Sequence, residues 1–408
     1  KQRTNSNRVM YYDEVMITPS GKEGESIITV NCPDKTGLGC DLCRVILFFG
    51  LSIFKADLST DGRWCYIVFW VGGSEETRWP LLKKRLLEAS PSFSSASGMS
   101  YFMPDVHPPN PADVFLLKLC CHNRKGLLHD AARVLFELEL TIKKVQVSTT
   151  PDGSLVNLFF VTDTRELLHT SIRKQDTKDY LHEVIGSSLT AIEIQKVGQE
   201  ITACTNESSF LPTSITEDTH SSSFLPESRV SVKMDDKFSP SHTLIQILCQ
   251  DHKGLLYDVM RALKDCNIQT SYGRFDGKAT GECELDLFVR QGDGSKVSDS
   301  GKQELSARLL REIRRPLRVS VASRGPDTEI MVANPVEASG KGRPLVFHDI
   351  TLALKLLETH VFTAEIRRRM IGDREFEVYR ILVEDGEKMN ASRSDIEAGV
   401  WKRLMGWV

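Results

Sequence analysis

The chain has 408 residues, a hydrophobic fraction of 40% and a formal net charge of −3. This length exceeds one ordinary hydrophobic core and predicts two to four domains, and the near-neutral charge argues against a dedicated nucleic-acid-binding protein. The longest apolar run, at 66–71, is too short to span a bilayer, so we expect no membrane insertion. Ten cysteines without framework spacing indicate a reducing compartment. We therefore expect a cytoplasmic protein, with the nucleus as an alternative, and a removed plastid-targeting peptide stays open because the chain starts at Lys1.

The first structural elements in chain order are a strand, a turn and a helix. An apolar run at 26–32 predicts a buried strand, and "DKTGLGCDLCRVI" at 34–46 predicts a turn followed by an amphipathic helix. Extended segments follow at 51–60 and 62–70.

The same turn and helix then return twice, as "NRKGLLHDAARVL" at 123–135 and "DHKGLLYDVMRAL" at 251–263. In each copy a glycine is followed four residues later by an aspartate and seven residues later by an arginine. These residues are Gly37, Asp41 and Arg44, then Gly126, Asp130 and Arg133, then Gly254, Asp258 and Arg261. Strands, a second helix and a last strand complete the second copy at 140–197 and the third copy at 283–323. The order βαββαβ is the ferredoxin-like plan.

A fourth copy at 328–408 is degenerate. Leu345 stands at the glycine position, Gly342 stands where Asp251 would be, and Pro344 removes a backbone donor. The sequence ends after the second helix, so this copy is predicted to lack its last strand and to act as a structural partner without a ligand site.

A Ser/Thr-rich segment separates the second and third copies. It contains "SSFLP" twice between residues 206 and 228, and its composition is typical of a flexible linker. We expect it to divide the repeats into two pairs. The doubled "SSFLP" is either a docking or phosphorylation element or a product of low complexity.

A βαββαβ unit whose first helix opens with D-x-K-G-L-L-x-D resembles the ACT domain. Four such units without another domain resemble the plant ACT-domain repeat proteins, the ACR family. The resemblance implies an α+β chain of four tandem ferredoxin-like ACT units that pair side by side through their sheet edges. The expected segments are an N-terminal extension at 1–25, ACT units at 26–104 and 113–198, the linker at 199–240, and ACT units at 241–324 and 328–408.

The resemblance also implies that amino acids bind at the interfaces between paired units, near the glycine turn. Free N–H groups and positive potential at a helix start suit an α-carboxylate, and glycine lets a ligand approach the backbone closely. The candidate ligand-binding residues are an amino-group acceptor, the glycine and the next residue of each turn: Asp34, Gly37, Leu38, Asn123, Gly126, Leu127, Asp251, Gly254 and Leu255. Ordinary turn and N-cap chemistry is the alternative explanation. The aspartate and arginine of each helix, three residues apart, are expected to form surface ion pairs.

An enzyme is not predicted, because the sequence contains no G-x-S-x-G, Walker A or H-E-x-x-H motif. Cys40 and Cys43 form a lone C-x-x-C that we interpret as structural, and no Cys or His residues show zinc-ligand spacing. We therefore expect no catalytic residues, no cofactor and no metal.

RNA binding is a weaker alternative, because RNA-recognition domains share the βαββαβ plan. Tyr66, Val68 and Trp70 would lie on an open sheet face, but Glu284 and Asp286 would lie on the matching face of the third copy and repel phosphate. A protein-interaction scaffold without a small ligand is the other alternative. The favoured interpretation is a non-catalytic sensor of amino acids in amino-acid or nitrogen metabolism, with glutamine suggested by the family's kinship to nitrogen-control proteins. Homo-oligomers through ACT pairing and a regulated protein partner are further expectations.

Overall fold

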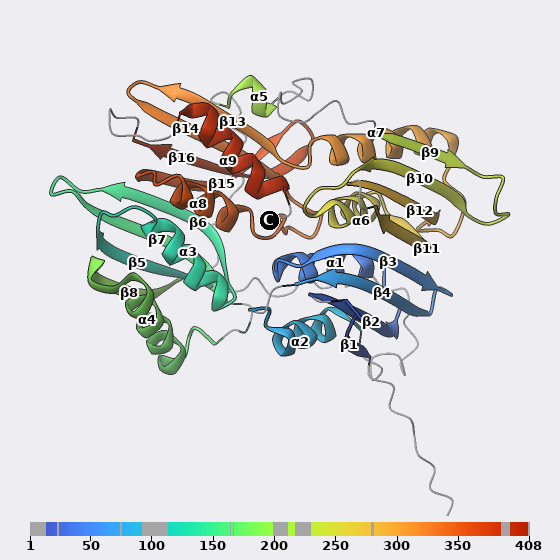
Figure 1. The fold of residues 1–408 in the computed structure, drawn as a ribbon, viewed down its shortest axis with the longest axis horizontal. Coiled ribbons are helices and arrows are strands. Elements are labelled where there is room, and N and C mark those ends of the chain that lie inside the picture. The colour runs from blue at the N-terminus through green and yellow to red at the C-terminus, as the bar shows by residue number, and fades with distance from the viewer. Residues whose placement is uncertain are drawn as a thin grey trace, which may run out of the picture. The chain divides into compact units, whose positions relative to one another are not determined.

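The computed structural model describes residues 14–91 except 23, 74 and 75, residues 113–198 except 164 and 166, and the ranges 211–216, 230–384 except 279 and 280, and 392–406. The chain divides into two compact units. We call the unit of residues 1–103 and 229–313 the 1/3 pair, because it contains the first and third repeats. The unit of residues 104–228 and 314–408 contains the second and fourth repeats and is called the 2/4 pair (Figure 1).

The 1/3 pair is built on one eight-stranded antiparallel sheet. The strands in spatial order are β1 (Val15–Pro19), β2 (Glu25–Pro33), β4 (Trp64–Gly72), β3 (Ser52–Thr60), β11 (Ile268–Gly277), β12 (Glu282–Gln291), β10 (Thr243–Gln250) and β9 (Ser231–Asp235). The helices are α1 (Leu38–Phe48), α2 (Trp79–Ala89), α6 (Leu255–Asp265) and α7 (Asp299–Arg314). Strands β3 and β11 join the two repeats edge to edge, and α1 contacts α6 above that joint.

The 2/4 pair has the same architecture. Its strands in spatial order are β13 (Arg318–Arg324), β14 (Asp327–Pro335), β16 (Arg374–Val383), β15 (Val361–Ile371), β6 (Leu140–Thr149), β7 (Ser154–Asp163), β5 (Val114–His122) and β8 (Leu189–Gly198). The helices are α3 (Leu127–Glu137), α4 (Ser171–Ile185) with a short 3₁₀ turn at Gly186–Ser188, α8 (Val346–Leu356), α9 (Arg393–Met405) and the four-residue α5 (Thr213–Thr216). Strands β6 and β15 form the joint, and α3 contacts α8.

Side-by-side pairing through sheet edges is thus confirmed, but the expected division by the linker is wrong. The repeats pair as first with third and second with fourth, so each pair is made of segments from both sides of the linker. Chain order constrains pairing only weakly, because the entropy of closing a long connection grows slowly with its length. The choice of partner must therefore lie in the contacts at the interface.

The edge strands depart from the expected order in three of the described repeats. Residues 317–323 were expected to close the third repeat, but β13 pairs with β14 of the fourth repeat through a turn at Gly325, whose φ is +69°. The third repeat is closed instead by β9, and the first by β1, which lies inside the expected N-terminal extension. Each of these edge strands forms a hairpin with the strand that follows it in the chain. A hairpin connection is short, so closing it costs less conformational entropy than a connection that crosses the sheet. The fourth repeat, predicted to lack a last strand, has that position filled by β13.

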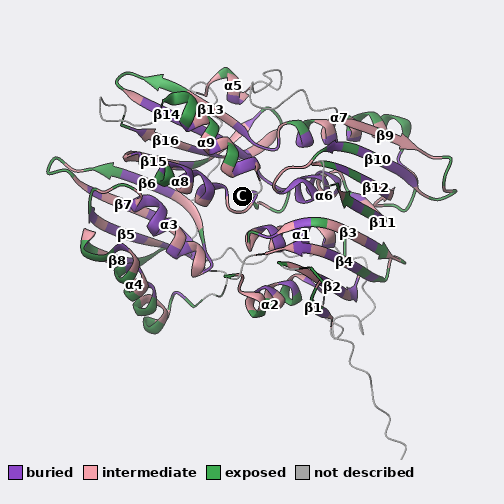
Figure 2. Ribbon diagram, viewed as in Figure 1, coloured by how far each residue is buried: buried purple, intermediate pink, exposed green. Residues whose placement is uncertain are grey.

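Alternation along the strands separates a buried face from an open face (Figure 2). In β4, Ile67 and Phe69 are buried against the helices, whereas Trp64 and Tyr66 on the other face are 37% and 49% exposed. One continuous core in each pair contains the helix-facing residues of the sheet and the apolar faces of the helices. The four long helices of each pair therefore cover the same side of their sheet.

Part of the expected flexible linker is ordered. Ile215 of α5 is fully buried against Met331 and Phe376, on the sheet face opposite the long helices. Arg318 Nη1 donates to the Ile215 carbonyl oxygen at 2.7 Å. Leu211 also packs there, so residues 211–216 are a docked segment, and the flexible-linker prediction is wrong for them. The second "SSFLP", at 222–226, lies outside the described residues.

Candidate functional site

The four repeats share a left-handed residue at the start of their first helix. This residue is the N-cap of the helix. The N-caps of α1, α3, α6 and α8 are, in that order, Gly37 (φ 78°), Gly126 (φ 73°), Gly254 (φ 80°) and Leu345 (φ 67°). Glycine adopts this conformation without steric cost, whereas a leucine is strained there. The turn is therefore a backbone requirement of every repeat, including the fourth repeat, which has no glycine.

The two glycines of the first and second repeats also make room for a lysine of the paired repeat. A Cβ on Gly37 would lie 2.7 Å from Cδ of Lys264, and a Cβ on Gly126 would lie 2.8 Å from Cγ of Lys355. Lys264 lies in the last turn of α6, and Lys355 lies in the last turn of α8. The close approach that we expected of a ligand is thus made here by lysine methylene groups.

Each of these lysines pairs with the aspartate of the helix that it crosses. Lys264 Nζ lies 2.8 Å from Asp41 Oδ1, and Lys355 Nζ lies 2.7 Å from Asp130 Oδ1. A second cation contacts each carboxylate from its own turn, Lys35 at 2.8 Å and Arg124 at 2.7 Å. Burial disfavours ionisation of both carboxyls, but these cations outweigh it and hold the pKa of each below its usual value.

The expected surface pairing of aspartate with the arginine three residues on is wrong for the first two repeats, because these lysines replace the arginine. It occurs in the third repeat, where Asp258 Oδ1 lies 3.1 Å from Arg261 Nη2. That pair is not on the surface: both side chains are fully buried, and Glu312 completes a buried triad at 2.7 Å from Arg261.

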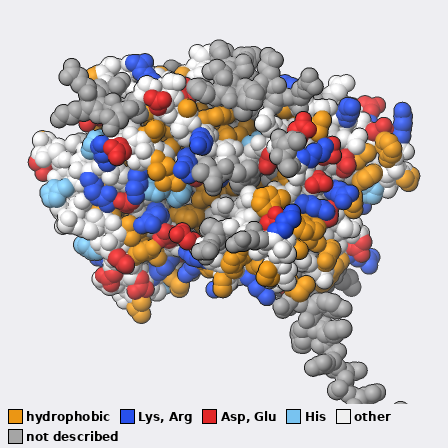
Figure 3. All heavy atoms as spheres, viewed as in Figure 1, with side chains coloured by type: hydrophobic (Ala, Val, Ile, Leu, Met, Phe, Trp, Pro, Cys, Tyr) orange, Lys and Arg blue, Asp and Glu red, His pale blue; other side chains and the backbone are white. Residues whose placement is uncertain are grey.

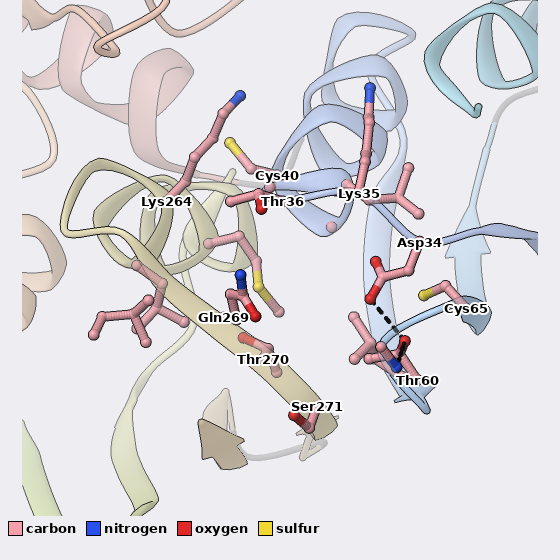
Figure 4. A pocket seen from close by; sticks show the side chains of 18 of the residues that line it. Asp34, Lys35, Thr36, Cys40, Thr60, Cys65, Lys264, Gln269, Thr270 and Ser271 are labelled. Atoms are coloured by element: carbon pink, nitrogen blue, oxygen red, sulfur yellow. Dashed lines mark hydrogen bonds between the residues drawn. The ribbon is translucent and has the colours of Figure 1, made fainter. Parts of the chain in front are cut away.

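A pocket opens in the 1/3 pair between the turn of the first repeat and the α6–β11 segment of the third (Figure 4). Including its open mouth, it has a volume of about 720 Å³. Asp34 points into it and accepts a hydrogen bond from Thr60 Oγ1 at 2.7 Å. Burial raises the pKa of this carboxyl. The wall from the third repeat carries Gln269, Thr270 and Arg290.

The equivalent pocket of the 2/4 pair is about half as large, at 350 Å³ with its mouth. Its rim holds Arg124, Gly126 and Lys355, and its interior includes His129 and Asn157. His129 is 4% exposed, and its Nδ1 lies 3.2 Å from Thr351 Oγ1.

The ring of His129 stacks in a tilted arrangement on His348, with 5.0 Å between the ring centroids. Burial disfavours the imidazolium and, together with His348 and Lys355, lowers the pKa of His129 to about 4.

The pockets contain five of the nine candidate residues. Asp34, Gly37 and Leu38 line the pocket of the 1/3 pair, and Gly126 and Leu127 line that of the 2/4 pair. Asn123, expected to accept from a ligand amino group, is exposed and lies outside the second pocket. Asp251, Gly254 and Leu255 of the third turn lie outside both pockets.

Sequence reasoning missed the side chains that complete the pockets from other elements. They are Thr60, Lys264, Arg290, Lys355 and Asn157. A signal for the lysines existed: both stand ten residues after the left-handed N-cap, in the third and fourth repeats. Leu47 and Phe136 stand at that position in the first and second repeats. This distribution favours pairing the first or second repeat with the third or fourth, as observed.

The turn of the fourth repeat is filled by its own side chains. Asn334 accepts from the backbone N–H of Arg343 and donates to its carbonyl, both at 3.1 Å. The Arg343 guanidinium is buried and donates to the carbonyl of Leu404 at 3.2 Å. These contacts fit the expected role of the fourth repeat as a structural partner.

The other candidate chemistries find little support. Cys40 and Cys43 are buried, and burial raises the pKa of Cys43 well above its usual value, so its thiolate is disfavoured. In the described part of the chain, no helix is long and apolar enough to cross a membrane, and no three His, Cys, Asp or Glu side chains are grouped to hold a metal. Lys and Arg are interspersed with Asp and Glu on the face seen in Figure 3.

For RNA, the aromatic Tyr66 does lie on the open sheet face of the first repeat. In the third repeat, Glu284 and Asp286 point to the corresponding face, opposite the helix-facing Leu285.

Side-by-side pairs of ferredoxin-like repeats, with a left-handed turn of one repeat facing its partner, define a tandem ACT-domain regulatory protein. Comparison with known families agrees. Residues 115–170 match the ACT domain, 16–91 match "ACT domain-containing protein ACR10, N-terminal", 231–327 match "ACR9-like, ACT-like domain", and 328–406 match "ACT domain-containing protein ACR9, C-terminal".

The relatives extend over nearly the whole chain. ACT domain-containing protein ACR10 of Arabidopsis thaliana is 56% identical over 403 residues, which cover 97% of this chain and 98% of the relative. ACT domain-containing protein ACR9 of the same plant is 47% identical with the same coverage. ACT domain-containing protein ACR5 of the same plant is 22% identical over 346 residues, which cover 79% of this chain and 74% of the relative. The chain belongs to the plant ACR family of ACT-domain repeat proteins.

Proposed function

We propose that this regulatory ACT-domain protein is a non-catalytic sensor that binds a free amino acid at the interface of the 1/3 pair. The observation that carries the proposal is the pocket lined by Asp34 of the first repeat and by Gln269, Thr270 and Arg290 of the third. An interface pocket with a few convergent polar groups is the usual form of a small-molecule site.

The polar groups of this pocket suit the two charged ends of an amino acid. The Asp34 carboxylate is the acceptor for the α-amino group, and Thr60 holds it in place by a 2.7 Å hydrogen bond. The α-carboxylate would lie near the start of α1, where the helix dipole and the Arg290 guanidinium favour negative charge. Gln269, Thr270 and Ser271 remain to contact the side chain.

Binding at this place would couple the ligand to the packing of the two repeats. The pocket walls belong to different repeats, so a ligand that contacts both favours the arrangement in which they are closest. A regulated protein partner that distinguishes the two arrangements would complete the sensor. The proposed setting is amino-acid or nitrogen metabolism in the cytoplasm, with glutamine as one candidate ligand.

The test is thermal unfolding of the purified chain against the twenty amino acids. A ligand at 100 times its Kd stabilises the folded state by about 2.7 kcal/mol, a readily measured shift. Asp34→Asn should remove the shift. Asp251→Asn changes the equivalent residue of the third turn, which lies outside both pockets, and should keep it. If no amino acid shifts the unfolding temperature, the sensor proposal fails and the scaffold without a ligand is favoured.

A further inference from the structure

The pocket of the 2/4 pair contains a buried amide oxygen that has no hydrogen-bond partner in the part of the chain that the structure describes. Asn157, on β7, is 2% exposed and lines this pocket. Its carboxamide oxygen has no hydrogen-bond donor among the described residues. A buried polar group in this state destabilises the folded protein unless a bound molecule satisfies it.

The other repeats show that the fold does not need an amide at this position. Asn157 pairs across the sheet with Leu119 of the first strand of its repeat. The residues at the same register are Ile67, Leu285 and Tyr379. The first and third repeats therefore have an apolar side chain at this place, whereas the second repeat has the polar Asn157.

The other polar groups of the pocket already have partners. Arg124 and Lys355 both pair with Asp130, at 2.7 Å each. Thr351 donates to the carbonyl of His348 at 3.0 Å, and Thr359 donates to that of Leu354 at 2.9 Å. The remaining walls are largely apolar and include Leu127, Val147, Leu155, Leu354 and Val361. The pocket thus combines a charged rim, apolar walls and an amide that is free to bond.

We propose that Asn157 makes the 2/4 pocket a second amino-acid site, selective for a side chain that ends in a carboxamide. A carboxamide both donates and accepts hydrogen bonds, and another carboxamide matches both functions in one plane. The charged end of the ligand lies at the rim, where Arg124 and Lys355 meet Asp130. A purely apolar side chain would leave Asn157 unsatisfied, which is how a buried polar group selects its ligand. This inference rests on the proposed function, because it takes the ligand to be an amino acid.

The experiment is calorimetric titration of the full chain with glutamine, asparagine, methionine and leucine. In the natural protein, glutamine and asparagine should bind at the 2/4 pair. Asn157→Leu, which introduces the residue type of Leu285, should lower the affinity for both at least tenfold. Methionine and leucine should be unaffected or bind more tightly. Ile67→Leu, at the same register of the 1/3 pair, is the matched control and should change none of these affinities.

A folding control accompanies the titrations. Without ligand, Asn157→Leu should unfold at a higher temperature than the natural protein, because it removes an unsatisfied buried amide. Hydrogen exchange in peptides of α3 and β7 should show protection by glutamine or asparagine that the variant loses. A cooperative unfolding transition in the variant excludes misfolding as the cause of lost binding.

The outcomes separate the two proposals. Binding that Asp34→Asn removes and Asn157→Leu leaves unchanged supports the sensor of the 1/3 pair and overturns the second site. Equal weakening of all four amino acids by Asn157→Leu overturns the selectivity. No binding of any amino acid by the natural protein overturns both proposals, and an ordered water bonded to Asn157 then accounts for the amide.

Discussion

The two pockets lie at the same place in their pairs but differ in what they offer a ligand. In both, a lysine from the first helix of the paired repeat crosses the left-handed glycine and pairs with the aspartate in the first turn of α1 or α3. The acceptor is Asp34 at the turn of the 1/3 pocket and Asn157 on the sheet of the 2/4 pocket. The left-handed turn and the crossing lysine are thus common to both joints, whereas the acceptor that the pocket offers differs in residue type and in its place in the repeat.

The pairs also differ three residues after the glycine, where Cys40 of the 1/3 pair corresponds to His129 of the 2/4 pair. Both are buried and line the pocket of their pair. A cysteine there is a small apolar group at ordinary pH, whereas a histidine is held neutral against its tendency to protonate. At this position, therefore, only the 2/4 pair carries a group whose protonation in acid would destabilise the fold.

The largest expected difference concerns the arginine seven residues after the glycine. Arg261→Met should destabilise the 1/3 pair by about 4 kcal/mol, because it removes the cation that the buried Asp258 and Glu312 share and leaves Glu312 with Arg308 alone, at 2.9 Å. Arg133 occupies the same position in the second repeat but is 44% exposed and lies 3.8 Å from Glu137. Arg133→Met should cost less than about 0.5 kcal/mol.

Urea unfolding of the two arginine variants measures this contrast. If both variants lose the same free energy of unfolding, the buried triad stabilises the fold no more than the exposed pair does. Glu312→Gln provides a further check, since it keeps the shape of the side chain and removes one of the two charges.

A second test separates backbone strain from crowding at the glycine turn. Gly126→Ala should destabilise the 2/4 pair by about 3 kcal/mol for two reasons. Alanine is strained in the left-handed conformation, and its Cβ would clash with the Lys355 side chain. Gly153 has a similar φ of +79° but nothing within 4 Å of an added Cβ. Gly153→Ala should therefore cost only about 1 kcal/mol, and thermal unfolding of both variants isolates the contribution of the lysine. If Lys355→Ala does not restore stability to Gly126→Ala, crowding is not the cause.

Much of the fold was predictable because each repeat carries its own local signals. The glycine, the aspartate and the apolar positions of the first helix fixed the α+β plan and the places of the turns. The choice of partners, first with third and second with fourth, was not predicted, because it depends on contacts between residues more than 200 positions apart, such as Lys264 with Asp41. The edge strands β1 and β9 were missed, and β13 was predicted as a strand but assigned to the third repeat, because an edge strand can come from either end of a repeat.

The candidate site was predictable only where one turn builds it. Asp34, Gly37 and Gly126 were found from the motif, and they line the pockets. Asn157 was not found, because a single asparagine in an apolar run carries no motif, and only the register shows that Ile67 and Leu285 are its equivalents. Comparing the repeats position by position along their strands was the step that would have found it.

The acid response of the 2/4 pair follows from His129. Its pKa is about 4 in the folded protein and about 6.5 when unfolded. Between these values the unfolded chain binds more protons, so the stability present above pH 6.5 is lost as the pH falls. The expected loss between pH 7 and pH 5 is about 2 kcal/mol. Hydrogen exchange of α3 and α8 peptides at the two pH values measures it, and His129→Gln should remove most of the difference while peptides of α1 and α6 serve as the internal reference.

The smallest effect tests the strained turn of the fourth repeat against its glycine counterparts. Leu345→Gly should stabilise the 2/4 pair by about 1 kcal/mol, because glycine adopts the φ of 67° without a Cβ penalty. Leu345→Ala keeps a Cβ and should give no gain, so the two variants separate backbone strain from side-chain packing. A loss of stability in both would mean that the half-buried leucine side chain contributes more by its contacts than its backbone costs. The fourth turn would then differ from the other three because side-chain packing, and not the left-handed backbone, determines its residue.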